Sequence, residues 1–336
     1  MAHLYQTPAQ LPRSCWPNSV IERGPVIHVI GGFTGHSAVN NAECYNDSHD
    51  VWEMDAIQPM KCSRSGFGVA EMHGLLFAVG GTVSGSSSRH VECYNPRHNR
   101  WYDVAPMISS RRSHGVAVIT GLEDSRTGAP FSYIFSIGGE QMNDTLSSVE
   151  RYNLWSNKWE EVAPLKIPKK NVGVGTVNSL VCVVGGSVPK EHEPHVHVEV
   201  KAVECYNPRI NVWEGMPSKH HCCSCPGVAV VNDCLYVVGG YCEGHWVAEA
   251  ECFNTVTKQW TVISSMTFPR TGIAAATLKG EVYAIGGFNG VLEDAKVLKT
   301  VEKYNPAENT WKQVTPLHLP RTVAGVVVSH IWTVQQ

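Results

Sequence analysis

The sequence predicts an all-β fold, a six-bladed β-propeller closed by a C-terminal strand, and three recurring observations predict it. A Gly-Gly pair follows a short apolar run six times, a Glu-x-aromatic-Asn element follows each pair, and a tryptophan stands seven residues beyond each aromatic residue. The apolar runs are rich in β-branched residues and are bounded by Gly, Pro and Asn, which indicates short strands joined by tight turns. Repeats of this length indicate a repetitive β architecture.

Each copy supplies four antiparallel strands, A to D. Strand A resembles "GVAVV", strand B ends in the Gly-Gly pair, strand C carries the aromatic residue and strand D begins at the tryptophan, as in the hairpin "YNPRHNRW". One such sheet cannot bury both of its faces, whereas six sheets around an axis pack on one another with Tyr and Trp rings between them. The second glycines and the aromatic–tryptophan pairs are Gly32, Gly81, Gly139, Gly186, Gly240 and Gly287, then Tyr45/Trp52, Tyr94/Trp101, Tyr152/Trp159, Tyr206/Trp213, Phe253/Trp260 and Tyr304/Trp311.

The two ends of the repeat region fit the closure of a ring. No strand of type A precedes "VIHVIGG", and the last repeat ends with "RTVAGVVVS" without a following Gly-Gly pair. We therefore expect the C-terminal strand to complete the first blade. The predicted organisation is an N-terminal linker or tail at 1–25, the propeller at 26–330 and a C-terminal tail at 331–336.

Composition disfavours several classes of partner. The net charge is -3, and no run of lysine or arginine exceeds two residues, so we expect neither nucleic acid nor membrane as a partner. The first 20 residues lack an apolar core of the signal-peptide type, and no apolar stretch approaches the length of a membrane span. We expect a cytoplasmic, intracellular chain in which most of the 12 cysteines are reduced thiols.

The six copies also serve as an internal control, because whatever recurs in all of them is scaffold. The strand-C glutamates recur, and a basic residue recurs four positions before the small residue of strand A, at Arg64, Arg111, Lys169, Arg270 and Arg321. We expect both sets to be structural and to pair with each other. A general-acid role for Glu43 or Glu204 is therefore disfavoured, and we expect no enzyme and no cofactor.

The stretch "HHCCSC" at 220–225 is the one copy without that basic residue, since Cys223 takes its place. Three interpretations remain open: a metal site with His220, His221, Cys222 and Cys225 as weak candidates, an accessible reactive thiol, or an ordinary loop. Cys44, Cys93, Cys205 and Cys252 fill one slot before the strand-C aromatic residue and are expected to be packing residues.

Loops alternate between the two ends of a meander, so the B–C and D–A loops share one face of the disc. "HHCCSC" lies on that face, and the two longest B–C loops, after Gly186 and Gly287, rise from it. The first of these, "SVPKEHEPHVHVEV", reads as a solvated excursion rather than a metal site. The single long A–B insertion, at 120–133, is expected to be a surface loop on the opposite face.

The double glycine, the tyrosine and the tryptophan at this spacing resemble the Kelch family over residues 26 to 330. The resemblance implies a propeller like the substrate-binding domain of BTB-BACK-Kelch ubiquitin-ligase adaptors, in which ligands contact residues just after the double glycine and just before strand A. Carried onto this chain, the implied binding residues are Phe33, His36, Ser65, Thr82, Arg112, Ser113, Glu140, Gln141, Lys170, Asn171, Ser187, Ser224, Cys225, Tyr241, Glu243, Trp246, Thr271, Phe288, Asn289 and Thr322.

The function that this resemblance implies is the binding of a protein or peptide substrate on the B–C/D–A face, as the substrate receptor of a cullin-RING ligase. Such a link would run through BTB and BACK domains, which this chain does not contain. The alternative is an actin- or cytoskeleton-binding Kelch protein. An enzyme of the Kelch-fold copper-oxidase type is disfavoured, because the tyrosines that could serve as ligands recur as packing residues.

Overall fold

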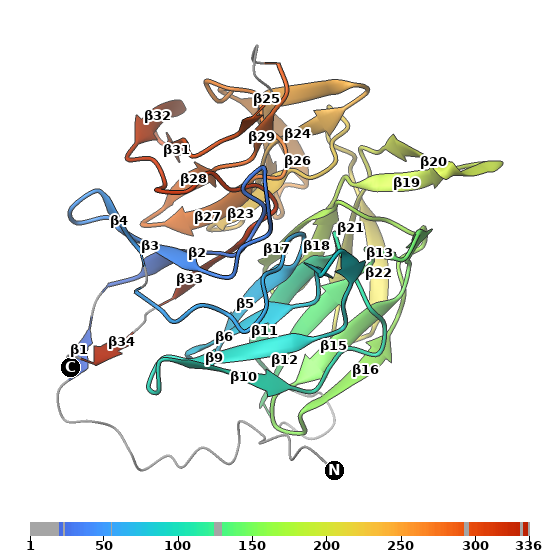
Figure 1. Ribbon diagram of the computed structural model, residues 1–336. Helices are drawn as coiled ribbons and strands as arrows, with labels where there is room; N and C mark the ends of the chain where they lie inside the picture. Colours follow the sequence, from blue (N-terminus) through green and yellow to red (C-terminus); the bar gives the residue numbers. More distant parts are fainter. Residues whose placement is uncertain are drawn as a thin grey trace.

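The computed structural model describes residues 20–22, 24–54, 56–123, 130–291, 296–329 and 332–334, and it is an all-β propeller of six four-stranded sheets around a central axis (Figure 1). Each sheet is an antiparallel meander in the order A, B, C, D. Blade 1 consists of β33 (Gly325–Ser329), β2 (Val26–Ile30), β3 (Ala42–Asn46) and β4 (Val51–Met54), and blade 2 of β5 (Gly68–Met72), β6 (Leu75–Val79), β9 (Val91–Asn95) and β10 (Arg100–Val104). Blade 3 consists of β11 (Gly115–Glu123), β12 (Pro130–Ile137), β15 (Val149–Asn153) and β16 (Lys158–Val162), and blade 4 of β17 (Gly173–Val177), β18 (Leu180–Val184), β21 (Val203–Asn207) and β22 (Val212–Met216). Blade 5 consists of β23 (Gly227–Val231), β24 (Cys234–Cys242), β25 (His245–Asn254) and β26 (Gln259–Ile263), and blade 6 of β27 (Ala274–Leu278), β28 (Glu281–Ile285), β31 (Val301–Asn305) and β32 (Thr310–Val314).

The ring closes as the sequence predicts, with a C-terminal strand in the first blade. Strand β33 pairs with β2 in antiparallel register, from Val26 opposite Ser329 to Ile30 opposite Gly325. A second contact between the chain ends was not predicted: β1 (Val20–Glu22) pairs with β34 (Trp332–Val334), within the segments expected to be tails. The two strands lie together beside blade 1 in Figure 1.

Aromatic rings hold neighbouring blades together. Within each blade the strand-C ring packs against the strand-D tryptophan at centroid distances of 4.9–5.3 Å. Each tryptophan then donates its indole N–H to a backbone carbonyl of the preceding blade, as Trp101 does to Gln58 at 2.8 Å. The same bond recurs in the other five blades. These rings therefore combine apolar burial with a directed hydrogen bond across each blade boundary.

The Gly-Gly pair is required by backbone conformation and by close approach to the next loop. The first glycine has φ of 58–63° and the second 91–114° in all six copies, a region that other residues rarely adopt. The second glycine also donates its N–H to a D–A loop carbonyl at 2.7–2.9 Å, as Gly81 does to Arg111. A Cβ at Gly81 would lie 2.8 Å from the carbonyl oxygen of Ser65.

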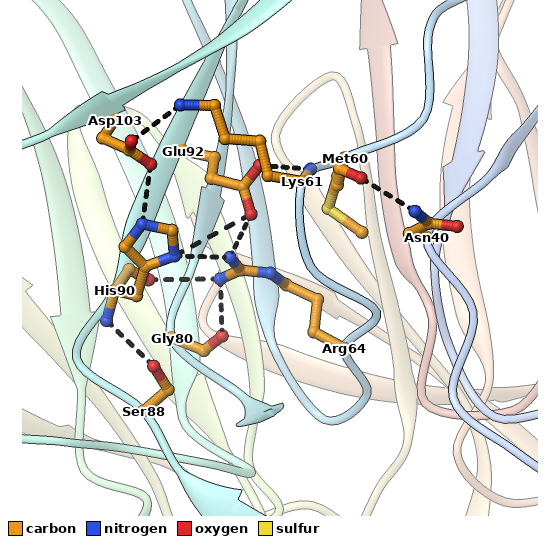
Figure 2. Close-up of polar contacts among 9 residues, drawn as sticks. All are labelled: Asn40, Met60, Lys61, Arg64, Gly80, Ser88, His90, Glu92 and Asp103. Carbon is orange, nitrogen blue, oxygen red and sulfur yellow. Dashed lines mark hydrogen bonds and ion pairs between the residues drawn. The ribbon is translucent and has the colours of Figure 1, made fainter. Parts of the chain in front are cut away.

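Buried ion pairs anchor the D–A loops, as expected from the recurring basic residues. The pairs are Arg64–Glu92, Arg111–Glu150, Lys169–Glu204, Arg270–Glu302 and Arg321–Glu43. Figure 2 shows the first: Arg64 also donates to the carbonyls of Gly80 and His90, and Glu92 accepts the backbone N–H of Lys61. The guanidinium and the carboxylate thus satisfy backbone groups as well as each other, as buried charges require.

A closed ring of backbone hydrogen bonds surrounds the propeller axis on the B–C/D–A side. Six residues just before strand A each donate an N–H to the carbonyl of the preceding member, at 2.8–3.0 Å. All six have φ between 45° and 62°, which turns both backbone groups along the ring. Its members are Gly66, Ser113, Asn171, Cys225, Gly272 and Val323. The ring fixes the positions of the loops that surround the channel mouth.

Five short ladders complete the fold. Four are hairpins in B–C loops, namely β7–β8 (Thr82–Val83, Ser86–Ser87), β13–β14 (Glu140–Gln141, Asp144–Thr145), β19–β20 (Ser187–Lys190, Glu193–Glu199) and β29–β30 (Phe288–Asn289, Lys296–Val297); the fifth is β1–β34. The β19–β20 hairpin projects from the disc (Figure 1). The described part of the A–B insertion extends β11 and β12 instead of forming a loop, and 124–129 lie outside the described residues. No helix of membrane-spanning length and hydropathy occurs among the residues described.

Candidate functional site

The residues implied as a binding face are brought together in pairs. In every blade, a residue just after the double glycine forms an isolated β-bridge with a residue just before strand A. The pairs are Phe33–Thr322, Ser65–Thr82, Arg112–Glu140, Lys170–Ser187, Ser224–Tyr241 and Thr271–Phe288. Twelve of the twenty implied residues therefore form one circle around the channel mouth, immediately outside the backbone ring.

The channel mouth itself is a small depression. A cavity of about 130 Å³ is lined by the backbone ring and the residues that follow it, so Ser113, Asn171 and Cys225 face the axis. Their N–H groups and carbonyls are already used in the ring, which leaves only their side chains for a ligand. Burial raises the pKa of the Cys225 thiol to about 12, so this residue is a neutral thiol at physiological pH.

A charged cluster occupies one side of the face. Glu140 accepts a hydrogen bond from Arg112 at 2.5 Å and another from Lys170 at 2.6 Å, and all three side chains are largely buried or half-buried. Burial alone would raise the pKa of Glu140, but the bonds from Arg112 and Lys170 outweigh it and hold the pKa below its usual value. Two cations share one carboxylate, so the cluster carries a net charge of +1.

An aromatic cluster occupies blades 5 and 6 on the same face. Tyr241 contacts Trp246 edge-on at a centroid distance of 5.6 Å, and Trp246 contacts Phe288 at 6.0 Å. All three rings are half-buried, and Trp246 packs over the backbone of Gly290, where a Cβ would lie 2.4 Å from the indole. The position of Tyr241 and Phe288 also carries a ring in blade 1, at Phe33, but not in blades 2, 3 and 4. The three rings are available to a ligand.

The remaining implied residues lie around these clusters with different exposure. His36 and Glu243 are exposed, and Gln141 is half-buried in the β13–β14 hairpin. Asn289 is an exception, because its side chain is fully buried and accepts the N–H of Val291 at 2.8 Å. We therefore assign Asn289 a structural role rather than a ligand contact. Across the face, His197 of the projecting hairpin hydrogen-bonds Thr145 at 2.9 Å.

The four weak metal candidates do not form a common site. Cys222 is bonded to Cys242 in a disulfide, and the Nδ1 atoms of His220 and His221 lie 2.8 and 3.2 Å from the carboxylate of Glu251. Cys223 is buried, and burial raises the pKa of its thiol, so the reactive-thiol interpretation fails there too. The "HHCCSC" stretch is instead part of the scaffold, attached by Glu251 and by Cys242.

Lys219 supplies the cation for the D–A loop that leads into blade 5, a role that the sequence did not predict. Its Nζ lies 2.9 Å from Glu251, so the sixth ion pair is present although Cys223 stands at the usual basic position. Lys219 is four residues earlier, and its long side chain reaches the same carboxylate. Burial would raise the pKa of Glu251, but bonds from the His220 backbone and from Lys219 lower it to about 2.

This pKa predicts a specific pH dependence. Because the pKa of Glu251 falls from 4.5 to about 2 on folding, its contribution to stability is complete above pH 4.5 and is lost as the pH falls toward 2. We expect Glu251→Gln to unfold at lower urea concentrations than the parent. The difference between the two urea midpoints is expected to narrow as the pH falls from 4.5 to 2. The exposed Glu214→Gln is the control, and a gap for Glu251→Gln that stays constant over this range would contradict the assignment.

Seven of the eleven cysteines that the structure describes are free thiols, as expected for most of them, and the other four form two disulfides. Cys182 of β18 lies directly opposite Cys205 of β21, with Cα atoms 4.1 Å apart, and the two are bonded, so Cys205 is not only a packing residue. The Cys222–Cys242 disulfide joins the D–A loop to the B–C hairpin of blade 5, next to Tyr241. The first pair was detectable, because the residue four before the second glycine is the cross-strand partner of the residue before the tyrosine. Cys242 carried no such signal.

Comparisons with known proteins agree with this geometry. The chain is 26% identical over 216 residues to "Kelch-like protein 15" of Homo sapiens, covering 59% of this chain and 35% of that protein. It is 27% identical over 221 residues to "Kelch-like protein 25" of Xenopus tropicalis, covering 63% and 34%. It is 26% identical over 208 residues to "Alpha-scruin" of Limulus polyphemus, covering 59% and 23%.

The chain spans about a third of the length of the Kelch-like relatives and less of Alpha-scruin. A family described as the Attractin/LZTR1 beta-propeller matches residues 27–295, most of the chain. The repeats, the six closed blades and this match lead to one conclusion: the chain belongs to the Attractin/LZTR1 beta-propeller family and is a Kelch-type propeller.

Proposed function

We propose that the chain is a non-catalytic protein-recognition module that binds a protein or peptide on its B–C/D–A face. The observation that carries the proposal is the presence of a cationic cluster and an aromatic cluster on one face, neither of which recurs in all six blades. Arg112 and Lys170 lie on one side of the channel mouth, and Tyr241, Trp246 and Phe288 on the other. Aromatic and arginine side chains are the residues that dominate binding energy at protein interfaces.

The two clusters define the ligand's chemistry. The arginine and the lysine together outnumber the one carboxylate between them, so an acidic side chain of a ligand is attracted and can replace Glu140 as a hydrogen-bond acceptor. The aromatic cluster offers ring area to an apolar side chain. The proposed ligand is therefore a segment that carries an acidic residue and an apolar residue, placed to reach across the channel mouth.

The finer role that we propose is that of a substrate receptor in a cullin-RING ubiquitin ligase, in the cytoplasm. The likeness to the two Kelch-like proteins supports this role. Recruitment of the ligase would run through BTB and BACK domains. Binding to actin filaments is the alternative, and cosedimentation of the chain with filaments distinguishes it from ligase-substrate binding.

Affinity capture with matched variants tests the recognition face. We expect Arg112→Gln/Tyr241→Ala to lose the proteins that the parent chain captures from lysate, by at least about tenfold, because each removed contact of this kind is worth about 1 kcal/mol or more. Quantitative mass spectrometry measures the captured set. The uncharged glutamine leaves Glu140 paired with Lys170, so the variant does not place carboxylates against one another.

The control carries the same kinds of change on the opposite face. Arg209 and Trp155 lie in C–D turns and are exposed, so Arg209→Gln/Trp155→Ala removes an arginine and a ring without touching the proposed site. The control is expected to capture the same proteins as the parent. If both variants lose the captured proteins equally, or if only the control loses them, the binding surface does not lie on the B–C/D–A face.

A further inference from the structure

Two groups of three potential metal ligands occur in the part of the chain that the structure describes. The first consists of Cys62, in the D–A loop that enters blade 2, with His90 and Glu92. The second consists of Cys222, in the D–A loop that enters blade 5, with two neighbouring residues of the β24–β25 hairpin, Cys242 and Glu243. In each group the potential ligand atoms lie within 4.8 Å of one another. The surroundings of the two groups decide which of them suits a metal ion.

A guanidinium group already occupies the first group. Arg64 bonds the carboxylate of Glu92 and lies 3.1 Å from Nδ1 of His90 (Figure 2). The other ring nitrogen of His90 lies 2.8 Å from the carboxylate of Asp103. Because the Arg64 and Glu92 side chains are fully buried, a metal ion would have to break a buried ion pair to bind here. This group is therefore part of the scaffold.

The second group consists of two sulfur atoms and a carboxylate, and it opens to solvent. Cys242 is half-buried and Glu243 is exposed at the tip of the hairpin, whereas Cys222 is buried in its loop. The two cysteines form a disulfide, with Cα atoms 5.6 Å apart. A cysteine binds a metal ion as a free thiolate, so these two sulfur atoms become ligands only when the disulfide is reduced.

Backbone hydrogen bonds keep the two segments together without help from the disulfide. Ser224 of the loop and Tyr241 of the hairpin exchange two N–H to carbonyl bonds, at 2.8 and 2.9 Å. Gly240, before Tyr241, donates its N–H to the carbonyl of Arg270 at 2.8 Å, which fixes the base of the hairpin. The two thiols are therefore expected to stay close together after reduction, which lowers the cost of bringing them to one metal ion.

A dithiol reductant opens this disulfide in two steps. Its thiolate attacks the sulfur of Cys242, the more exposed of the two, and Cys222 leaves as a thiolate that takes up a proton. The second thiol of the reductant then attacks the mixed disulfide and releases Cys242 as a thiol. The reductant becomes a disulfide, and the chain gains two electrons and two protons. The other disulfide, Cys182–Cys205, is shielded from such attack, because its residues are 0% and 3% exposed.

We propose that Cys222 and Cys242, in the reduced chain, bind Zn²⁺ together with Glu243. Binding releases the two thiol protons, so two thiolates and a carboxylate surround the ion and water completes its four ligands. Thiolate ligands favour Zn²⁺ over Mg²⁺ and Ca²⁺, which prefer oxygen. The proposal does not depend on the recognition function, because it concerns metal bound to the chain alone.

Metal binding by the chain in its two redox states tests the proposal. The chain is reduced with a phosphine, which adds no competing thiol, freed of metal in the absence of oxygen, and titrated with Co²⁺ and then Zn²⁺. The reduced chain is expected to develop a sulfur-to-cobalt charge-transfer band that saturates at a single ion per chain and disappears when Zn²⁺ replaces Co²⁺. The oxidised chain, with its disulfide intact, is expected to show no such band.

Matched variants locate the bound ion. Cys242→Ser removes a sulfur ligand and is expected to abolish the charge-transfer band. The control Cys234→Ser removes a free, half-buried cysteine from the same strand and is expected to keep the band. Glu243→Gln is expected to keep the band but to weaken Zn²⁺ binding by at least about tenfold, since losing even an outer partner of a ligand costs about 10–100-fold in affinity.

Alkylation of the reduced parent chain gives a test that needs no variant. Zn²⁺ is expected to slow the alkylation of Cys242, measured by mass spectrometry, and to leave that of Cys234 unchanged. The proposal is wrong if the reduced chain binds neither Co²⁺ nor Zn²⁺, or if the oxidised chain binds them equally well. It is also wrong if Zn²⁺ leaves Cys242 unprotected, because the ion is then bound by other residues.

Discussion

Replacing Arg111 by methionine is expected to lower the free energy of unfolding by about 3–5 kcal/mol, the range for removing one partner of a buried ion pair. The Arg111 and Glu150 side chains are both fully buried, and the guanidinium also donates to the carbonyls of Gly138 and Ser148 at 2.8 and 2.7 Å. Methionine keeps most of the apolar stem but removes the cation that pairs with the Glu150 carboxylate and the two guanidinium bonds to the carbonyls of Gly138 and Ser148. The carboxylate keeps the N–H groups of Ile108 and Ser109 but loses its opposite charge. Urea unfolding followed by tryptophan fluorescence measures the loss.

The next residue in the chain provides the matched control. Arg112 is also an arginine bonded to a glutamate, but its side chain is 32% exposed, so Arg112→Met is expected to cost no more than about 1 kcal/mol. The double variant Arg111→Met/Glu150→Leu removes the orphaned carboxylate and is expected to be more stable than Arg111→Met alone. If Arg111→Met and Arg112→Met lower the free energy of unfolding by the same amount, the anchoring role assigned to the buried pair is wrong.

Gly81→Ala is the second change with a large expected effect. Gly81 has φ of 91°, and a Cβ there would lie 2.5 Å from Cβ of Phe67 and 2.8 Å from the carbonyl oxygen of Ser65. The variant therefore suffers both backbone strain of about 1–2 kcal/mol and overpacking of about 1–3 kcal/mol. Because this glycine contacts the loop that enters blade 2, the damage includes the channel mouth.

Gly85 separates the two contributions. Its φ of 82° is similar, but a Cβ there would meet nothing within 4 Å. Gly85→Ala is therefore expected to show the backbone strain alone, so the difference between the two variants in thermal or urea unfolding reports the close approach of the loop. Equal destabilisation would mean that the double glycine is needed only for its conformation and not for packing.

The repeating part of the molecule was predictable because a feature that occurs at the same spacing in several copies is recognisable as structural. The double glycines, the Tyr–Trp pairs and the basic residues each have one structural role that recurs from blade to blade. The structure confirms the strands, the ring closure and the Arg–Glu pairing. Twelve of the implied binding residues come together, because bridges such as Arg112–Glu140 form at equivalent places in each blade. Their role as ligand contacts stays a prediction.

Contacts that occur in only one blade were harder to predict, because side chains at different sequence positions can reach the same partner. Lys219 reaches Glu251 from four residues before the expected place, and the two histidines beside it bind the same carboxylate instead of a metal. The pairing of Cys222 with Cys242 depends on the path of a hairpin that no repeat predicts. The pairing of Arg112 and Lys170 with one glutamate depends likewise on the side-chain geometry of a single blade boundary.

The most direct test of the recognition face is hydrogen–deuterium exchange of the chain alone and in complex with a captured partner. The account predicts slower exchange in the segments around Arg112, Glu140 and Lys170 and in the β24–β25 hairpin that contains Tyr241, which border the channel mouth. Protection confined to the C–D turns, such as the one that contains Trp155, would place the binding surface on the opposite side of the propeller and contradict the account.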